Sequence, residues 1–162
     1  MIALRSSHAL LALGLPAALA WSSVGQTQQV SATHQGHSLP PTTTTQSLKA
    51  TLVGTTEVPG PGDPDGTGAA TVAIDVAKNQ LCYTIKVAQV DGVIMAHIHR
   101  APMGSMGNVV LPLSAPTTGS SEGCVQVKPE LAAAILAAPT DYYVNVHSQA
   151  YQAGAVRGQL GR

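Results

Sequence analysis

The sequence predicts an all-β protein: an antiparallel β-sandwich with Greek-key connections and one short helix. Apolar residues recur at every second position in short runs, which is the period of a half-buried strand. Turn-forming residues separate these runs, since 16 glycines and 11 prolines are spread over 162 residues. Because there is no Phe and only one Trp, we expect a core built mainly from Val, Ile, Leu and Ala.

The first 20 residues have the features of a signal peptide. Arg5 supplies a positive charge, residues 10–19 form an apolar run, and Ala18-Leu19-Ala20 fits the small-x-small rule for cleavage. We therefore expect cleavage after Ala20 and an exported protein that is periplasmic, on the cell surface or secreted. The alternative is an uncleaved anchor, although the run is short for a bilayer, which needs about 20 apolar residues.

Residues 21–46 are rich in Ser, Thr, Gln and Pro and have little hydrophobic periodicity, which predicts a disordered linker. The folded domain is expected to cover residues 47–162, and no later run is long and apolar enough to span a membrane. Strands are predicted at residues 48–53, 70–76, 81–87, 94–100, 108–113, 122–128, 142–147 and 155–160.

Two elements of the domain carry more specific expectations. Alternation in the second strand points Val72, Ile74 and Val76 towards the core. The one predicted helix, at residues 129–138, begins with a proline and has a glutamate in its first turn, and Pro139 ends it.

The chain has two cysteines, Cys82 and Cys124, both in predicted strands. An even pair in an exported protein predicts a disulfide, because the compartment is oxidising. Closing a loop of about 40 residues would stabilise the fold by roughly 4 kcal/mol in the chain-entropy treatment. Two separate buried thiols are the alternative.

Three histidines form the candidate site. His97 and His99 are two residues apart on one predicted strand, so their side chains share a face with Cα atoms about 6.5–7 Å apart. Met95 lies on the same face. His147 belongs to a later strand and alternates with its apolar valines. If these two strands are neighbours, the three imidazoles can meet at one ion.

Imidazole suits copper and zinc, and copper has the higher intrinsic affinity. Met103 and Met106 lie in the turn after the His-x-His strand, and thioether sulfur favours Cu(I). We therefore expect a metal site of His97, His99, His147, Met103 and Met106, with copper as the first candidate and zinc as the alternative. The competing interpretation is that the histidines are structural and bond the backbone or one another.

Other functions lack their signatures. Charged residues make up 10% of the chain, the net charge is zero and no basic run occurs, which argues against nucleic-acid binding. There is no phosphate-binding loop or dinucleotide fingerprint. Binding is therefore favoured over catalysis.

Four spaced motifs link the chain to a known family: LVGTTEVP at 52–59, HIH at 97–99, YVNVH at 143–147 and RGQL at 157–160. In this order they resemble the CHRD domain over residues 47–162, which implies an all-β sandwich. In chordin, such repeats belong to an extracellular protein that binds growth factors, so an extracellular protein partner or matrix role is the alternative to a metal ion. The chain departs from the family pattern at the turn 100–107, at Ser148 and at Ala155.

A weaker, local resemblance is to copper–zinc superoxide dismutase, which is also an antiparallel sandwich with a disulfide and a His-x-His strand at its copper. It would imply a redox enzyme with His97, His99 and His147 as copper ligands. The sequence has no convincing cluster of further ligands for the zinc half of such a site.

Overall fold

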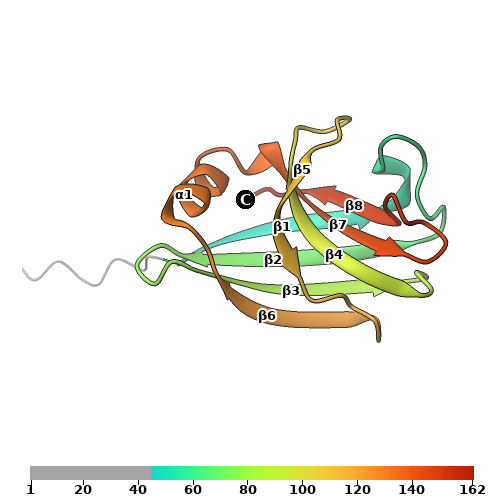
Figure 1. The fold of residues 1–162 in the computed structure, drawn as a ribbon, viewed down its shortest axis with the longest axis horizontal. Coiled ribbons are helices and arrows are strands. Elements are labelled where there is room, and N and C mark those ends of the chain that lie inside the picture. Colours follow the sequence, from blue (N-terminus) through green and yellow to red (C-terminus); the bar gives the residue numbers. More distant parts are fainter. Residues whose placement is uncertain (1–44) are drawn as a thin grey trace, which may run out of the picture. The chain divides into compact units, whose positions relative to one another are not determined.

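The computed structural model describes residues 45–162 (Figure 1). The predicted signal peptide and nearly all of the predicted linker lie outside the described residues. The strands are β1 (Thr45–Val53), β2 (Thr67–Asp75), β3 (Gln80–Ala88), β4 (Val93–Arg100), β5 (Asn108–Leu113), β6 (Ser120–Gln126), β7 (Tyr142–Ser148) and β8 (Val156–Gln159). The helices are α1 (Pro129–Ala137) and two 3-10 turns, η1 (Gly54–Thr56) and η2 (Pro139–Asp141).

All eight strands belong to one antiparallel sheet in the order β5-β4-β7-β8-β1-β2-β3-β6. The sheet curls into a nearly closed, barrel- or sandwich-like shape. The two ends of this order come close where the Ser121 hydroxyl of β6 donates to the Ser114 carbonyl after β5, at 2.8 Å. The predicted all-β antiparallel class with one short helix is confirmed.

The core lies inside the curved sheet and follows the alternation of the sequence. Alternate residues of β1, β2, β3, β4 and β7 are fully buried, among them Leu48, Leu52, Val72, Ile74, Leu81, Ile85, Ile98 and Val144. Helix α1 lies at one end of the sheet and adds Ala132 and Ile135 to the same cluster (Figure 1). Its apolar face explains why this short segment remains helical, since nine residues are too few for a stable isolated helix.

Two details differ from the sequence-based expectation. Val76 is exposed, because β2 ends at Asp75 and the chain has already entered the turn to β3. Strand β1 begins at Thr45, where Thr45 and Gln46 pair with the end of β2. Their side chains are exposed, so backbone pairing extends the strand where no apolar pattern marks it.

A disulfide joins Cys82 on β3 to Cys124 on β6. The two residues are direct partners in the strand register, with Cα atoms 4.0 Å apart. The bond therefore holds the edge strand β6 to the rest of the sheet. None of the helices within residues 45–162 has the length and apolar character needed to cross a membrane.

Candidate metal centre

The candidate site lies on the outer face of β4, β7 and β8. On these strands the buried valines and isoleucine face the core, and the alternate residues carry polar and aromatic side chains outward. The register aligns these residues across the strands: His97 with Asn145, Asn145 with Arg157, His99 with Tyr143, and Met95 with His147.

The pairing of β4 with β7 brings the three predicted histidines together. One nitrogen from each of His97, His99 and His147 lies within 4.8 Å of the other two. His99 and His147 are buried, with 9% and 7% of their surface exposed, and His97 is half-buried. Among the described residues, this is the group of histidine, cysteine and acidic side chains whose geometry suits a metal ion.

Backbone carbonyls fix the orientation of the two buried rings. His147 Nδ1 donates to the Gln152 carbonyl at 3.0 Å, and His99 Nδ1 donates to the Gly107 carbonyl at 2.9 Å. Because a carbonyl can only accept, each Nδ1 carries the proton and each Nε2 keeps its lone pair. His97 Nδ1 lies 3.2 Å from His147 Nε2 and therefore donates to it.

His99 Nε2 is a buried acceptor without a hydrogen-bond partner among the described residues. A buried polar atom left unsatisfied usually costs about 1–3 kcal/mol, so such atoms are rare in stable folds. Here the unsatisfied lone pair belongs to the cluster of three imidazoles. This donor set fits a transition-metal ion, which would bind the lone pair of His99 Nε2 and take the place of the hydrogen bond between His97 and His147.

Burial lowers the pKa of each of the three histidines below 6.5, because the charged imidazolium loses solvation. The other two histidines lower the pKa of His97 further, and His147 and Arg157 act in the same way on His99. The carbonyl bonds to His99 and His147 oppose this effect without reversing it. The rings are therefore neutral at pH 7, which is the form that binds metals.

A stack of side chains connects the site to the loop 101–107. The Tyr143 ring lies parallel to His99, with centroids 4.8 Å apart, and the Arg157 guanidinium lies 3.4 Å from the centroid of Tyr143. Arg157 also donates to the carbonyls of Pro102 and Ser105. The same loop ends at Gly107, which holds His99, so Arg157 positions this ring from two directions.

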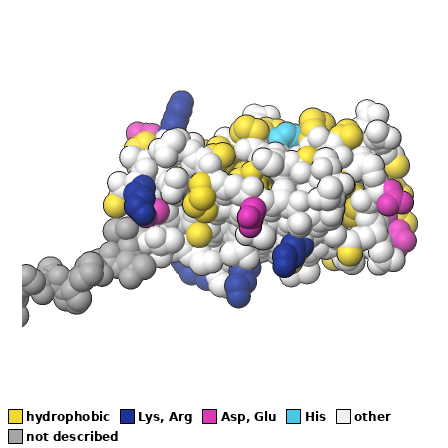
Figure 2. Space-filling model, turned by 90° about the horizontal axis from the view of Figure 1, so that it is seen from below, with side chains coloured by type: hydrophobic (Ala, Val, Ile, Leu, Met, Phe, Trp, Pro, Cys, Tyr) yellow, Lys and Arg dark blue, Asp and Glu magenta, His cyan; other side chains and the backbone are white. Residues whose placement is uncertain are grey.

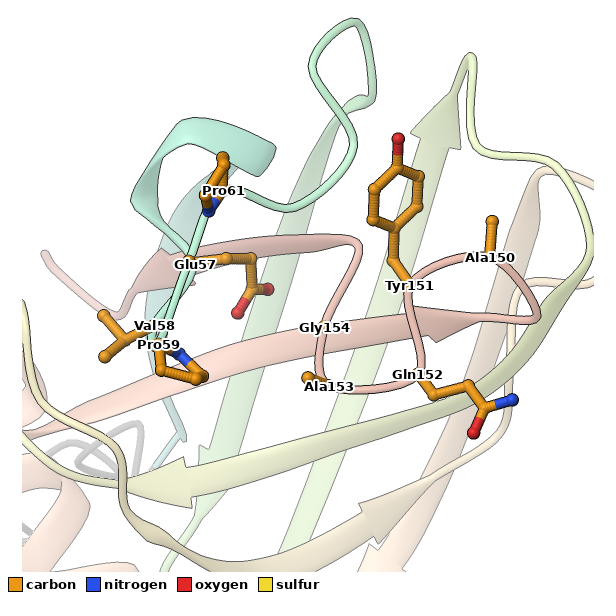
Figure 3. A pocket seen from close by; sticks show the side chains of 10 residues that line it. Glu57, Val58, Pro59, Pro61, Ala150, Tyr151, Gln152, Ala153 and Gly154 are labelled. Carbon is orange, nitrogen blue, oxygen red and sulfur yellow. The ribbon is translucent and has the colours of Figure 1, made fainter.

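Glu57 adds a buried carboxyl group to the polar side chains on the outer face of β4, β7 and β8. Asn145 donates to its carboxyl group, and burial raises the pKa of Glu57 to about 7, against a smaller lowering by Arg157. The carboxyl group points towards Gly154 in a cavity of about 290 Å³ between the segments 57–61 and 150–154 (Figure 3). The second segment contains Gln152, whose carbonyl holds His147.

Glu57, Asn145 and Arg157 were not among the predicted site residues. All three lie in the motifs of the sequence, and Asn145 and Arg157 alternate with apolar residues on their strands. Alternation alone assigns such side chains to a solvent-exposed face. Only the loops that fold over this face bury them.

The methionines that the sequence places near the histidines lie on two different segments. Met103 and Met106 are exposed on the loop after β4, and Met103 borders a small cavity with Thr51, Thr56 and Arg157. Met95 is on β4 itself, as the register partner of His147. In Figure 2, a histidine side chain reaches the surface among hydrophobic side chains, with charged groups spread thinly over the same face.

The comparison with protein families agrees with the motifs. The family model described as CHRD domain matches residues 48–160. This range includes the strands that carry the three histidines and the whole sheet except the first three residues of β1. No curated protein and no solved structure matches the chain.

Proposed function

The chain belongs to the CHRD domain family, and from its histidine cluster we propose that it is an exported module that binds copper at His97, His99 and His147. The observation that carries the proposal is the lone pair of His99 Nε2, which is buried without a partner beside two other imidazoles. Export is part of the proposal and rests on the predicted signal peptide together with the disulfide.

The alternative of structural histidines fits these contacts less well. A histidine that serves only the fold would be expected to satisfy both ring nitrogens with the protein. His99 instead uses Nδ1 to fix the ring and leaves Nε2 without a partner among the described residues, while the second nitrogen of His147 accepts only from another ring of the cluster. A ring that bonds a carbonyl through one nitrogen and keeps the other nitrogen for an ion is characteristic of metal ligands, whose second nitrogen commonly donates to a carbonyl or carboxylate.

Copper is the first candidate for the ion. Three imidazoles also suit zinc, but divalent copper binds nitrogen ligands more tightly than zinc does. A soft thioether donor would favour Cu(I) over Cu(II). The sequence names Met103 and Met106 on the exposed loop for this part, and their replacement by leucine tests whether they fill it. Zinc remains the alternative ion.

The proposal is tested by the metal content and copper affinity of the purified mature chain. His97→Ala combined with His99→Ala should abolish stoichiometric binding without loss of the fold, and His147→Ala alone should weaken binding severalfold or more. His34→Ala with His37→Ala is the matched control, because it removes two histidines that do not belong to the proposed ligand group. Wild-type protein that binds no metal better than millimolar would contradict the proposal and favour an extracellular interaction module.

A redox activity of the superoxide dismutase type requires more than the proposed ion. Copper would have to cycle between two oxidation states while superoxide reaches it. The partly exposed position of His97 allows access from solvent, but no second group of ligands suited to a zinc ion occurs among residues 45–162. Measuring superoxide turnover by the copper-loaded protein separates an enzyme from a binding module.

A further inference from the structure

A β-bulge controls the position of Met95. Val93 pairs with Ser148 and Met95 pairs with His147, so Ile94 is an extra residue on β4 that has no partner on β7. Val93 and Ala96 are both buried, and the bulge between them turns Ile94 and Met95 outward. Without the extra residue, the alternation that buries Val93 would point Met95 into the core.

This position places Met95 beside two of the three imidazoles. Directly opposed residues on antiparallel strands have Cβ atoms about 4.5–5.5 Å apart, and Met95 is directly opposite His147. It is also two residues from His97 on the same face. The side chain is 43% exposed, so core packing does not hold its thioether away from the cluster. Methionine is unbranched and flexible enough to direct its sulfur there.

The charges around the cluster favour an ion of low charge. The group that suits a metal consists of three imidazoles, which bind metals in their neutral form, and contains no carboxylate or thiolate. Both cysteines are in the disulfide. The Arg157 guanidinium lies on the Tyr143 ring that stacks on His99, and its charge acts on His99. Its repulsion of a divalent ion is twice its repulsion of a monovalent ion at the same distance.

Glu57 offsets part of this positive charge, since it lies near Arg157, but it is not a member of the ligand group. Asn145 donates a hydrogen bond to its carboxyl group and so occupies the position between Glu57 and the histidine strand. No described acidic side chain therefore supplies the negative charge that a divalent ion would gain from a carboxylate ligand.

We propose that Met95 is the fourth ligand of the ion and that the site is selective for monovalent copper, held by three neutral imidazoles and one thioether. This inference rests on the proposed function, because it names the ion and the ligand that complete the same site. A soft sulfur donor favours Cu(I) over zinc, and the neutral ligand set beside a guanidinium acts in the same direction.

The test measures the affinities of the wild type, Met95→Leu and Ile94→Leu for Cu(I) and for zinc. Cu(I) affinity is determined without oxygen by competition with a chromogenic chelator, and zinc affinity is determined by calorimetry. Met95→Leu should weaken Cu(I) binding at least tenfold and change zinc binding less than twofold. The matched control is Ile94→Leu, which alters the neighbouring exposed residue of the bulge and should change neither affinity. Met95→Leu protein that binds Cu(I) as tightly as the wild type overturns the inference.

X-ray absorption of the Cu(I)-loaded proteins gives a second readout, because it reports sulfur bound to copper directly. The copper–sulfur signal should be present in the wild type and absent in Met95→Leu. If the signal persists there and is lost in Met103→Leu with Met106→Leu, the loop supplies the ligand and the inference is wrong.

The two proposals fail in different ways. If the wild type binds neither ion, or if the His97 and His99 double variant binds as well as the wild type, the proposed function itself is wrong. If the histidines are required but Met95→Leu leaves Cu(I) affinity unchanged, only the assignment of Met95 and the preference for Cu(I) are wrong.

Discussion

Each buried histidine of the cluster owes its orientation to a loop that the sheet positions. Gly107 holds His99 and Gln152 holds His147, both through backbone carbonyls. At Gly107, an added Cβ atom would collide with the Arg100 carbonyl, so the loop can approach β4 this closely only with glycine. The donor geometry therefore depends on backbone groups that no search for ligand residues would identify.

The pH dependence of metal binding follows from the lowered pKa of the three imidazoles. Sequence alone suggests that copper affinity falls below about pH 6.5, the ordinary value for histidine. Burial delays protonation of these rings, so affinity should remain steady through pH 6.5 and fall only at lower pH. Copper titrations between pH 4.5 and 8 check this expectation.

A synthetic peptide of residues 94–100 is the matched control for this titration. It carries His97 and His99 without the fold, and it should begin to lose copper at a higher pH than the protein. Coincident curves for protein and peptide would show that burial does not protect the ligands from protons.

The raised pKa of Glu57 makes the stability of the fold itself depend on pH. Its folded-state pKa of about 7 exceeds its ordinary value of 4.5, so the folded protein holds this proton where the unfolded chain has lost it. Its contribution to the free energy of unfolding therefore falls as pH rises from about 4.5 to about 7. At about 1.4 kcal/mol per pKa unit, the loss is roughly 3 kcal/mol at most.

Glu57→Gln removes this titration and keeps an oxygen that can accept from Asn145. The stability of the variant relative to the wild type should increase by up to roughly 3 kcal/mol between pH 4.5 and pH 8. Urea denaturation of both proteins across this range measures the difference, in which the contribution of the histidines cancels. A difference that is independent of pH would mean that Glu57 titrates near its ordinary value.

At the scale of elements, local patterns predicted the strands well, because each strand is marked by the alternation of its own residues. Period-two alternation located the strands, and Pro129 with Glu130 located the start of α1. At the ends of strands, where alternation no longer matches backbone pairing, the predicted bounds were wrong. Val76 continues the apolar alternation but belongs to a turn, and Thr45 has no apolar neighbours to reveal its pairing.

The disulfide between β3 and β6 should matter for stability and not for metal binding. Cys82→Ser with Cys124→Ser should lower the free energy of unfolding by about 2–5 kcal/mol, the usual range for small secreted domains. The histidine strands β4 and β7 pair with neither β3 nor β6, so copper affinity should be unchanged. Denaturation and copper titration of the same variant check both parts. A stable variant that has lost copper binding would contradict the separation of the two regions.

At the scale of the whole molecule, the order of strands could not be predicted from the sequence. It depends on pairings between distant segments, such as β3 with β6 and β8 with β1, which leave no local pattern. The candidate ligands could be named in advance, because His97, His99 and His147 occupy the outward positions of their strands. That β4 and β7 are neighbours was a condition of the hypothesis, and only the fold supplies it.

The distance along the chain between the histidines determines when the site can exist. His97 and His147 are 50 residues apart, and the contact between their rings depends on the pairing of β4 with β7. Of the three proposed ligands, an unfolded chain keeps only the pair His97 and His99 close together, which is a weaker, two-ligand chelate. If the proposed export carries the unfolded chain across a membrane, the proposed ion would therefore bind only after the chain folds on the far side, and its binding would add to the stability of the newly formed sheet.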